Sequence, residues 1–135
     1  KSSAASDVYK RQDPACVSAF IDDMASAYAW ADLVLCRAGA TTVAELCAAG
    51  LPSVLVPFPY AVHDHQTRNA QALVAEGAAL MLPEARMEDD GLMEQVTGLL
   101  QDTERLRAMA AAASGCARIR AAELVAAELE TVCAR

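Results

Sequence analysis

The sequence has no excess of basic residues. Its 135 residues include 11 Lys and Arg against 18 Asp and Glu, so the formal net charge is −7 at pH 7. Proteins that bind nucleic acid neutralise phosphates with clustered cations, and anionic membrane surfaces attract the same kind of patch. This composition therefore predicts no nucleic-acid partner, and it offers no basic patch for an anionic membrane.

Paired cysteines, long apolar runs and internal repeats are also missing. The cysteine count is odd, no two cysteines form a CxxC pair, and no apolar run reaches the length of a membrane span. We see no secretory signal peptide. Scattered cysteines of this kind are typical of reduced, buried thiols in a cytoplasmic protein. The five are Cys16, Cys36, Cys47, Cys116 and Cys133.

The chain has little that could serve as a nucleophile or a metal site. His63 and His65 are the only two histidines, and only Asp64 is adjacent to them. A zinc site needs more ligands than this, and no serine or cysteine stands in a recognisable nucleophile motif. We therefore expect no catalytic residue, no metal and no cofactor in this sequence.

The first 12 residues differ in composition from the rest. KSSAASDVYKRQ has no apolar period, and DVYKRQ resembles a translated adapter from library preparation. We expect residues 1–12 to be a sequencing artefact or a disordered leader and exclude them from the fold. The remainder, residues 13–135, is apolar enough for one folded domain, since 55% of the whole sequence is hydrophobic.

From residue 13 onward, short apolar runs alternate with helical periodicity. Strands are predicted at residues 16–21, 32–36, 53–57 and 78–82, and helices at residues 24–31, 43–49 and 66–76. Asp22 or Asp23 would cap the first helix, and Gly50 and Gly77 would end the other two. Helices around residues 92–100, 106–114 and 122–132 follow. This order predicts an α/β fold, a parallel sheet of about four strands flanked by helices, with a helical C-terminal tail.

Two polar inserts, residues 37–42 and 58–65, follow predicted strands. Right-handed crossovers place both at the same edge of the sheet, where ligands of such folds bind. In the first insert, small residues would let a ligand approach the backbone at a helix N-terminus, which favours anions. With the hydroxyls of Thr41 and Thr42 and the charge of Arg37, this insert suits a diphosphate.

The spacing around Glu45 allows two interpretations. Thr42 and Glu45 match the capping box S/T-x-x-E, in which Glu45 would bond only to the backbone N–H of Thr42. A carboxylate one turn into a helix beside a phosphate site can instead bind a ribose diol. The spacing leaves both open.

The second insert leads into the segment DHQTRNA, which is rich in polar side chains. The amides of Gln66 and Asn69 suit sugar hydroxyls, since an amide both donates and accepts. Alternatively the insert is a solvated loop, Gln66 is a first-turn helix residue and Asn69 bonds a nearby loop.

Three motifs together make the sequence recognisable. RAGA-T-x-x-AE, AAGLP-x-x-x-VPFP and DHQ-x-x-NA lie within residues 20–83. In this combination they closely resemble the donor-binding domain of the MurG family, the bacterial N-acetylglucosaminyltransferases that convert lipid I to lipid II in peptidoglycan synthesis. The resemblance implies a GT-B fold, two Rossmann-like domains with a cleft between them, in which the C-terminal domain binds most of UDP-N-acetylglucosamine.

The resemblance also implies a set of binding residues. Ile21 would meet the uracil through its backbone, Glu45 would hold the ribose hydroxyls and Gln66 would contact the N-acetylglucosamine. The segment that lines the diphosphate and nucleotide would comprise Ala40, Thr41, Thr42 and Val43. Supporting positions would be Phe20 and Met24 near the base, Arg37 and Gly39 in the first motif, and His65 and Asn69 in the sugar loop.

The family pattern has parts that this sequence lacks. Its N-terminal acceptor domain, with the expected catalytic base and the membrane-facing patch, is not here, nor are the first strands and the glycine-rich serine loop of the donor domain. Residues 13–135 thus look like a truncated UDP-sugar-binding domain, roughly the last third of a two-domain enzyme. Lipid I and the inner face of the bacterial membrane would be reached through the missing domain.

Alternatives remain at this point. The chain could come from another UDP-sugar transferase or an epimerase, with the DHQ-x-x-NA loop deciding the sugar. It could also be a non-catalytic nucleotide-binding module, or a truncated gene product with no role of its own.

Overall fold

The structure is a computed structural model that describes residues 16–117. The expected leader at residues 1–12 and the expected last helix at residues 122–132 lie outside this range. In the part that is described, no helix is both long and apolar enough to cross a membrane.

A parallel sheet forms the centre of the fold. Its strands are β1 (Val34–Cys36), β2 (Ser53–Leu55) and β3 (Ala79–Met81), in the order β1-β2-β3. Leu35 is level with Val54, and Val54 with Leu80. The predicted α/β class with a parallel sheet is confirmed, with three strands in the described residues instead of about four.

The strand expected at residues 16–21 is wrong. These residues are all exposed and have no strand geometry, and the hydroxyl of Ser18 donates to the carbonyl of Phe20 at 2.6 Å. An apolar run becomes a strand only where its backbone groups find a neighbouring strand, and this run pairs with none in the described residues.

Helices precede, connect and follow the strands. They are α2 (Met24–Trp30), α3 (Ala40–Ala49), α4 (His65–Ala75), α5 (Asp90–Gln101) and α6 (Thr103–Gly115), with short 3₁₀ turns at Val62–Asp64 and Glu84–Arg86. Asp23 caps α2 by accepting from the N–H of Ser26 at 3.0 Å. Asp102 caps α6 in the same way.

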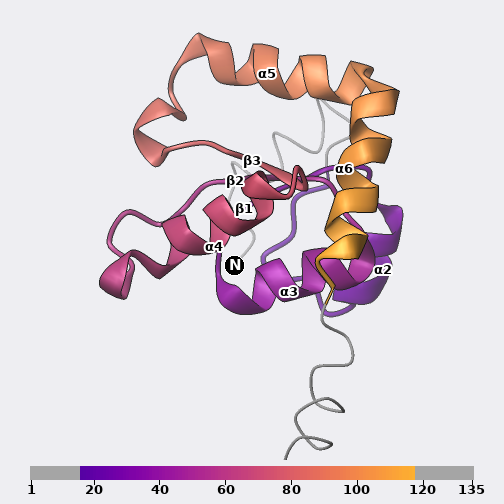
Figure 1. Ribbon diagram of the computed structural model, residues 1–135, viewed down its shortest axis with the longest axis horizontal. Helices are drawn as coiled ribbons and strands as arrows, with labels where there is room; N and C mark the ends of the chain where they lie inside the picture. The colour runs from indigo at the N-terminus through magenta and orange to yellow at the C-terminus, as the bar shows by residue number, and fades with distance from the viewer. Residues whose placement is uncertain (1–15, 118–135) are drawn as a thin grey trace, which may run out of the picture.

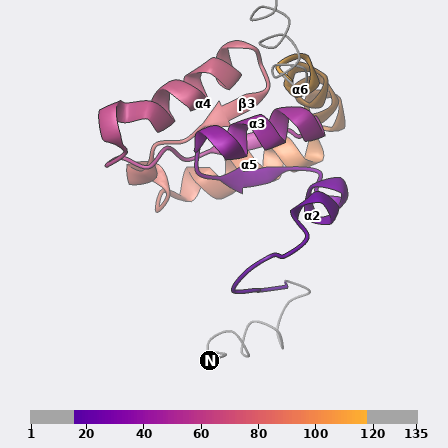
Figure 2. The ribbon, with the colours of Figure 1, turned by 90° about the horizontal axis from the view of Figure 1, so that it is seen from below.

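The helices cover both faces of the sheet. Figures 1 and 2 show α3 and α4 on one face, α5 on the other, and α6 alongside. Because successive strand residues point to opposite faces, Leu55 packs with Leu46 of α3 while Val54 packs with Leu99 of α5. Helix α6 contributes to both clusters, through Ala113 and Met109.

Two predicted helix ends are confirmed. Gly50 and Gly77 have φ of +63° and +75°, a left-handed conformation that glycine adopts without a steric cost. After Gly50, the N–H of Leu51 bonds to the carbonyl of Leu46 at 3.0 Å, and the chain turns directly into β2. These turns set the strands parallel, with their carboxyl ends at one edge.

The four cysteines in the described range are free thiols. Burial raises the pKa of the Cys36 and Cys47 thiols, and neighbouring Cys116 adds to the effect at Cys47. A raised pKa favours the protonated thiol over the reactive thiolate at both positions. The expectation of buried thiols holds fully for Cys47 alone, since Cys36 and Cys116 are half-buried and Cys16 is exposed.

Candidate functional site

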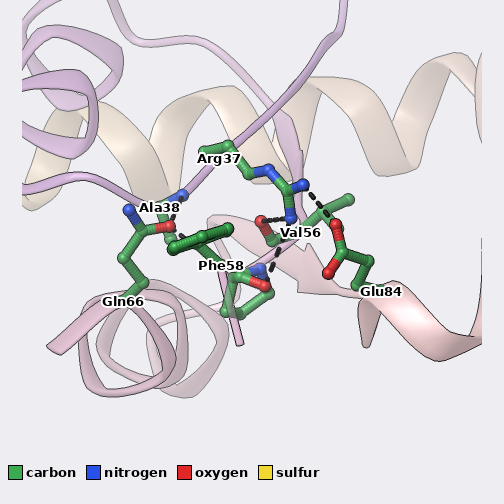
Figure 3. A network of polar contacts seen from close by, with 7 residues as sticks. Arg37, Ala38, Val56, Phe58, Gln66 and Glu84 are labelled. Carbon is green, nitrogen blue, oxygen red and sulfur yellow. Dashed lines mark hydrogen bonds and ion pairs between the residues drawn. The ribbon is translucent and has the colours of Figure 1, made fainter. Parts of the chain in front are cut away.

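The segments that follow the three strands lie side by side, and Arg37 joins them (Figure 3). Its Nη1 lies 3.5 Å from the carbonyls of Val56 and Pro57 after β2, and its Nη2 pairs with Glu84 after β3. The guanidinium carbon also lies 5.5 Å from the centre of the Phe58 ring, within cation–π range. Arg37 is therefore engaged by the protein itself.

Two amide side chains from the first turns of α4 reach back to the β1–α3 loop. The Oε1 atom of Gln66 accepts hydrogen bonds from the backbone N–H of Ala38 at 3.2 Å and of Phe58 at 2.9 Å (Figure 3). Asn69 donates from Nδ2 to the carbonyl of Ala38 at 3.0 Å. The interpretation of Asn69 as a residue that bonds a nearby loop is confirmed, and Gln66 does the same with its acceptor oxygen.

Helix α3 begins directly after this loop and has no side-chain cap. Gly39 is its N-cap, with φ −65° and ψ 148°, and the first residues of the helix are Ala40, Thr41 and Thr42. The N–H of Val43 is the first to bond within the helix, to the carbonyl of Gly39 at 2.9 Å. The backbone N–H groups before it, together with the positive end of the helix dipole, suit an anion.

The capping-box interpretation of Glu45 is wrong. The helix begins two residues before Thr42, so Thr42 is not the cap. Instead, the Oε2 atom of Glu45 accepts a hydrogen bond from the phenol of Tyr28 on α2, at 2.7 Å. Glu45 is exposed, and its Oε1 has no partner among the residues that the structure describes.

Tyr28 is a site residue that sequence reasoning missed. Partial burial and the hydrogen bond to Glu45 raise the pKa of Tyr28 to about 12, so the phenol remains a donor at neutral pH. The two residues are 17 positions apart and lie on different helices. No spacing rule connects them, and a lone tyrosine in an apolar helix has the pattern of a core residue.

A groove of about 860 Å³ lies along α3 and α4 and reaches the end of α6. Its size falls in the range of small-molecule sites. Four of the predicted binding residues line it, namely Ala40, Thr41, Val43 and Glu45, whereas Thr42 and Gln66 do not. The structure thus gathers most of the expected diphosphate and ribose residues on one surface.

The residues expected near the base are not gathered there. Phe20, Ile21 and Met24 are 75%, 48% and 38% exposed, and none lines the groove. The resemblance points to them, but no contact in the described structure does.

The loop before α4 has an unusual backbone. His63 and Asp64 both have positive φ, 52° and 55°, and the rings of His63 and His65 lie 5.9 Å apart, edge to face. Non-glycine residues with positive φ are uncommon and often occur at functional sites. Within residues 16–117, no group of three or more His, Cys, Asp or Glu side chains could hold a metal ion.

Comparisons with known proteins agree on one family. The model of the glycosyltransferase family 28 C-terminal domain matches residues 1–126. The chain is 57% identical over 113 residues to the UDP-N-acetylglucosamine--N-acetylmuramyl-(pentapeptide) pyrophosphoryl-undecaprenol N-acetylglucosamine transferase of Lawsonia intracellularis, covering 84% of this chain and 31% of the relative. It is 60% identical over 110 residues to the transferase of the same name from Xylella fastidiosa, covering 82% and 30%.

A solved structure gives the same result. The crystal structure of MurG from Acinetobacter baumannii is similar with a TM-score of 0.67 and 45% sequence identity, over 73% of this chain and 28% of that one. The chain therefore spans about 30% of the length of the curated relatives it matches.

Proposed function

The chain belongs to the glycosyltransferase family 28 C-terminal domain family, and from this premise we propose that it binds UDP-N-acetylglucosamine as the donor for transfer to lipid I. The observation that carries the proposal is the uncapped N-terminus of α3 at the carboxyl end of β1, beside the carboxylate of Glu45. Residues 13–135 then form part of the donor-binding domain of a GT-B transferase.

The start of α3 is the proposed diphosphate site. Backbone N–H groups at Ala40 and Thr41, with the hydroxyls of Thr41 and Thr42, would donate to phosphate oxygens. The same dipole end stabilises the charge that grows on UDP as the glycosidic bond breaks. In this proposal the chain's own donors hold the diphosphate. Arg37 acts indirectly, because its guanidinium holds the strand ends together.

Glu45 is the proposed ribose ligand. Tyr28 holds one carboxylate oxygen, which leaves Oε1 to accept from a ribose hydroxyl. Fixing the carboxylate before the ligand arrives reduces the entropy that is lost on binding. Ile21, with Phe20 and Met24, would contact the uracil.

Gln66 is the proposed sugar ligand. An amide can usually both donate and accept, but Gln66 can act toward the sugar only as a donor. Its Oε1 already accepts two backbone hydrogen bonds, so only its Nε2 hydrogens are left for an oxygen of N-acetylglucosamine. His65 lies next to it at the start of α4 and would support the sugar loop.

The remaining parts of the reaction are assigned to segments that this chain does not span. In the whole enzyme, a muramoyl hydroxyl of lipid I would attack the anomeric carbon with inversion, and UDP would leave. The catalytic base, the acceptor site and the contact with the inner face of the membrane would lie in the preceding domain. We therefore expect the purified chain alone to give no turnover of lipid I.

A chimera tests this function. The chain would replace the matching segment of the Lawsonia intracellularis transferase, to which it is 57% identical. We expect transfer from UDP-N-acetylglucosamine to lipid I, with UDP-glucose and UDP-galactose as poor donors. Glu45→Gln should raise the KM for the donor roughly tenfold, because the neutral amide is a weaker acceptor than a carboxylate.

Two outcomes would overturn the proposal. One is a folded chimera without any transfer, and the other is a KM for the donor that Glu45→Gln leaves unchanged. Glu76→Gln is the matched control, since Glu76 lines the same groove directly after α4 but has no proposed ligand. Its KM should stay at the value of the unchanged chimera.

A further inference from the structure

We infer that Gln66 and Asn69 are positioning residues. Together they clamp the loop between β1 and α3, one as a hydrogen-bond acceptor and the other as a donor. Gln66 works through its acceptor oxygen and Asn69 through its donor nitrogen. The inference deepens the proposed function, and rests on it, in so far as this loop carries the diphosphate site. The clamp itself can be tested without any ligand.

The partners fix the orientation of both amides. The two groups that face Gln66 are backbone N–H donors, from Ala38 and Phe58, so the atom toward them must be the oxygen. The group that faces Asn69 is the carbonyl of Ala38, so the atom toward it must be the nitrogen. Neither amide can be flipped without placing donor against donor or acceptor against acceptor.

The clamp acts on Ala38, whose backbone groups have no other hydrogen-bond partner within residues 16–117. Ala38 is fully buried and lies two residues beyond the end of β1, so its backbone groups take no part in the sheet ladder. The side chains of α4 satisfy both its N–H and its carbonyl. A buried backbone group left unpaired is destabilising, so loss of either side chain would displace the loop.

The position of Ala38 determines where α3 begins. Gly39, the N-cap, is the next residue, and the uncapped amides follow it. Through the bond to Phe58, the same Gln66 oxygen also ties the loop after β2 to the loop after β1 (Figure 3). Helix α4 thereby sets the geometry of the proposed diphosphate site at the start of α3.

Matched acid substitutions separate this role from ordinary packing. Gln66→Glu keeps an oxygen that accepts both N–H bonds, whereas Asn69→Asp points a carboxylate at a carbonyl. The measurement is amide hydrogen exchange by NMR in the purified 135-residue chain, reported as protection factors for Ala38 and Phe58. At pH 7, we expect Gln66→Glu to keep protection within about twofold, and Asn69→Asp to lower that of Ala38 roughly tenfold.

The pH dependence gives a second signature. When the introduced carboxylate of Asn69→Asp is protonated, its O–H can donate to the carbonyl of Ala38, so protection should recover toward pH 4. In Gln66→Glu, protonation weakens the acceptor, so protection should fall over the same range. Gln66→Met has a similar length without an acceptor and should lose protection roughly tenfold at both pH values.

The clamp is refuted if Gln66→Glu and Gln66→Met lose protection equally, or if the two acid variants respond to pH in the same direction. Circular dichroism shows whether each variant is folded. If Asn69→Asp does not fold at pH 7, its recovery at pH 4 still reports the donor role. Titration of the chimera with UDP then tests the donor site separately, since a chimera that keeps the clamp but binds no UDP contradicts the proposed function alone.

Discussion

At the scale of single residues, polar side chains at the carboxyl edge of the sheet mostly bind the protein's own chain. Arg37 contacts the segments after β2 and β3, and Gln66 and Asn69 hold the loop after β1. Arg37 is one of the residues on which the predicted diphosphate site rested, and Gln66 and Asn69 are those on which the predicted sugar contacts rested. Part of the polarity of a binding loop therefore serves to hold its backbone in place, which is what a preorganised site requires.

Tyr28 and Glu45 give a residue-scale prediction. The folded protein holds the phenolic proton up to a pKa of about 12, above the ordinary value of 10. The unfolded chain loses that proton first as the pH rises, so the stability from this pair is complete below pH 10 and is lost between pH 10 and about 12. Tyr28→Phe should lower the free energy of unfolding by about 0.5 kcal/mol at pH 8, a small value because water screens the bond.

Urea unfolding of both proteins from pH 8 to pH 11.5 measures this effect. We expect the two curves of stability against pH to converge at the alkaline end. If the two curves stayed parallel instead, the stability of the protein would not depend on the protonation of Tyr28 in its bond to Glu45. Tyr60→Phe serves as the control, because Tyr60 is 83% exposed.

At the scale of elements, the ends of the helices place the site. Helix α3 begins without a side-chain cap where the proposed ligand would bind, and it ends at Gly50 in a left-handed turn. Helices α2 and α6 are capped by aspartates, whereas α4 and α5, like α3, begin without a hydrogen bond from a capping side chain. The unpaired backbone N–H groups at the start of α3 therefore lower the local stability. A bound anion would accept from these groups and compensate for the loss.

Gly50 and Gly77 give an element-scale prediction. Both have positive φ, so alanine at either position should cost about 1 kcal/mol of stability. At Gly50 a Cβ atom would also clash with the Oγ of Ser114 on α6, whereas nothing lies within 4 Å at Gly77. We therefore expect Gly50→Ala to be the more destabilising change in chemical unfolding.

The double variant Gly50→Ala with Ser114→Ala tests whether the clash with the Ser114 hydroxyl causes the larger loss of stability. Removing the hydroxyl should bring the loss of stability down to that of Gly77→Ala, while Ser114→Ala alone should change little, since Ser114 is exposed. An unchanged double variant would mean that the contact with α6 does not contribute.

At the scale of the whole molecule, two apolar clusters on opposite faces share one strand. Leu46 and Leu55 belong to the cluster under α3 and α4, and Val54 and Leu99 to the cluster under α5. Because β2 supplies both clusters and α6 contacts both, neither should melt without the other.

Leu46→Ala and Leu99→Ala test this coupling. Both side chains are almost completely buried, at 0% and 2% exposure, so each change should cost about 2–5 kcal/mol. We expect one unfolding transition in each variant, observed by circular dichroism and calorimetry, and shifted to lower temperature. Two separate transitions, of which only one is shifted, would contradict a single cooperative unit.

Much of the fold follows from local patterns. Apolar periodicity predicted the parallel α/β class, and glycines, which tolerate positive φ, predicted the ends of α3 and α4. Both features depend on residues that are neighbours in the sequence. The family resemblance is confirmed by a family model that matches residues 1–126. The predicted strand at residues 16–21 is wrong because strand formation needs a partner that a local pattern does not supply.

The sequence by itself determined most of the elements, the edge at which both polar inserts lie, and the family, but not the unpaired segment at residues 16–21. Tertiary structure decided what the individual polar atoms do. The phenol of Tyr28 donates to Glu45, 17 residues away in the sequence, and the N–H of Ala38 donates to Gln66, 28 residues away. A hydrogen bond depends on where two atoms lie after the helices have packed, and spacing along one element carries no such information. Glu45 therefore matches a capping box in sequence and, in the fold, is a carboxylate held by a tyrosine from another helix.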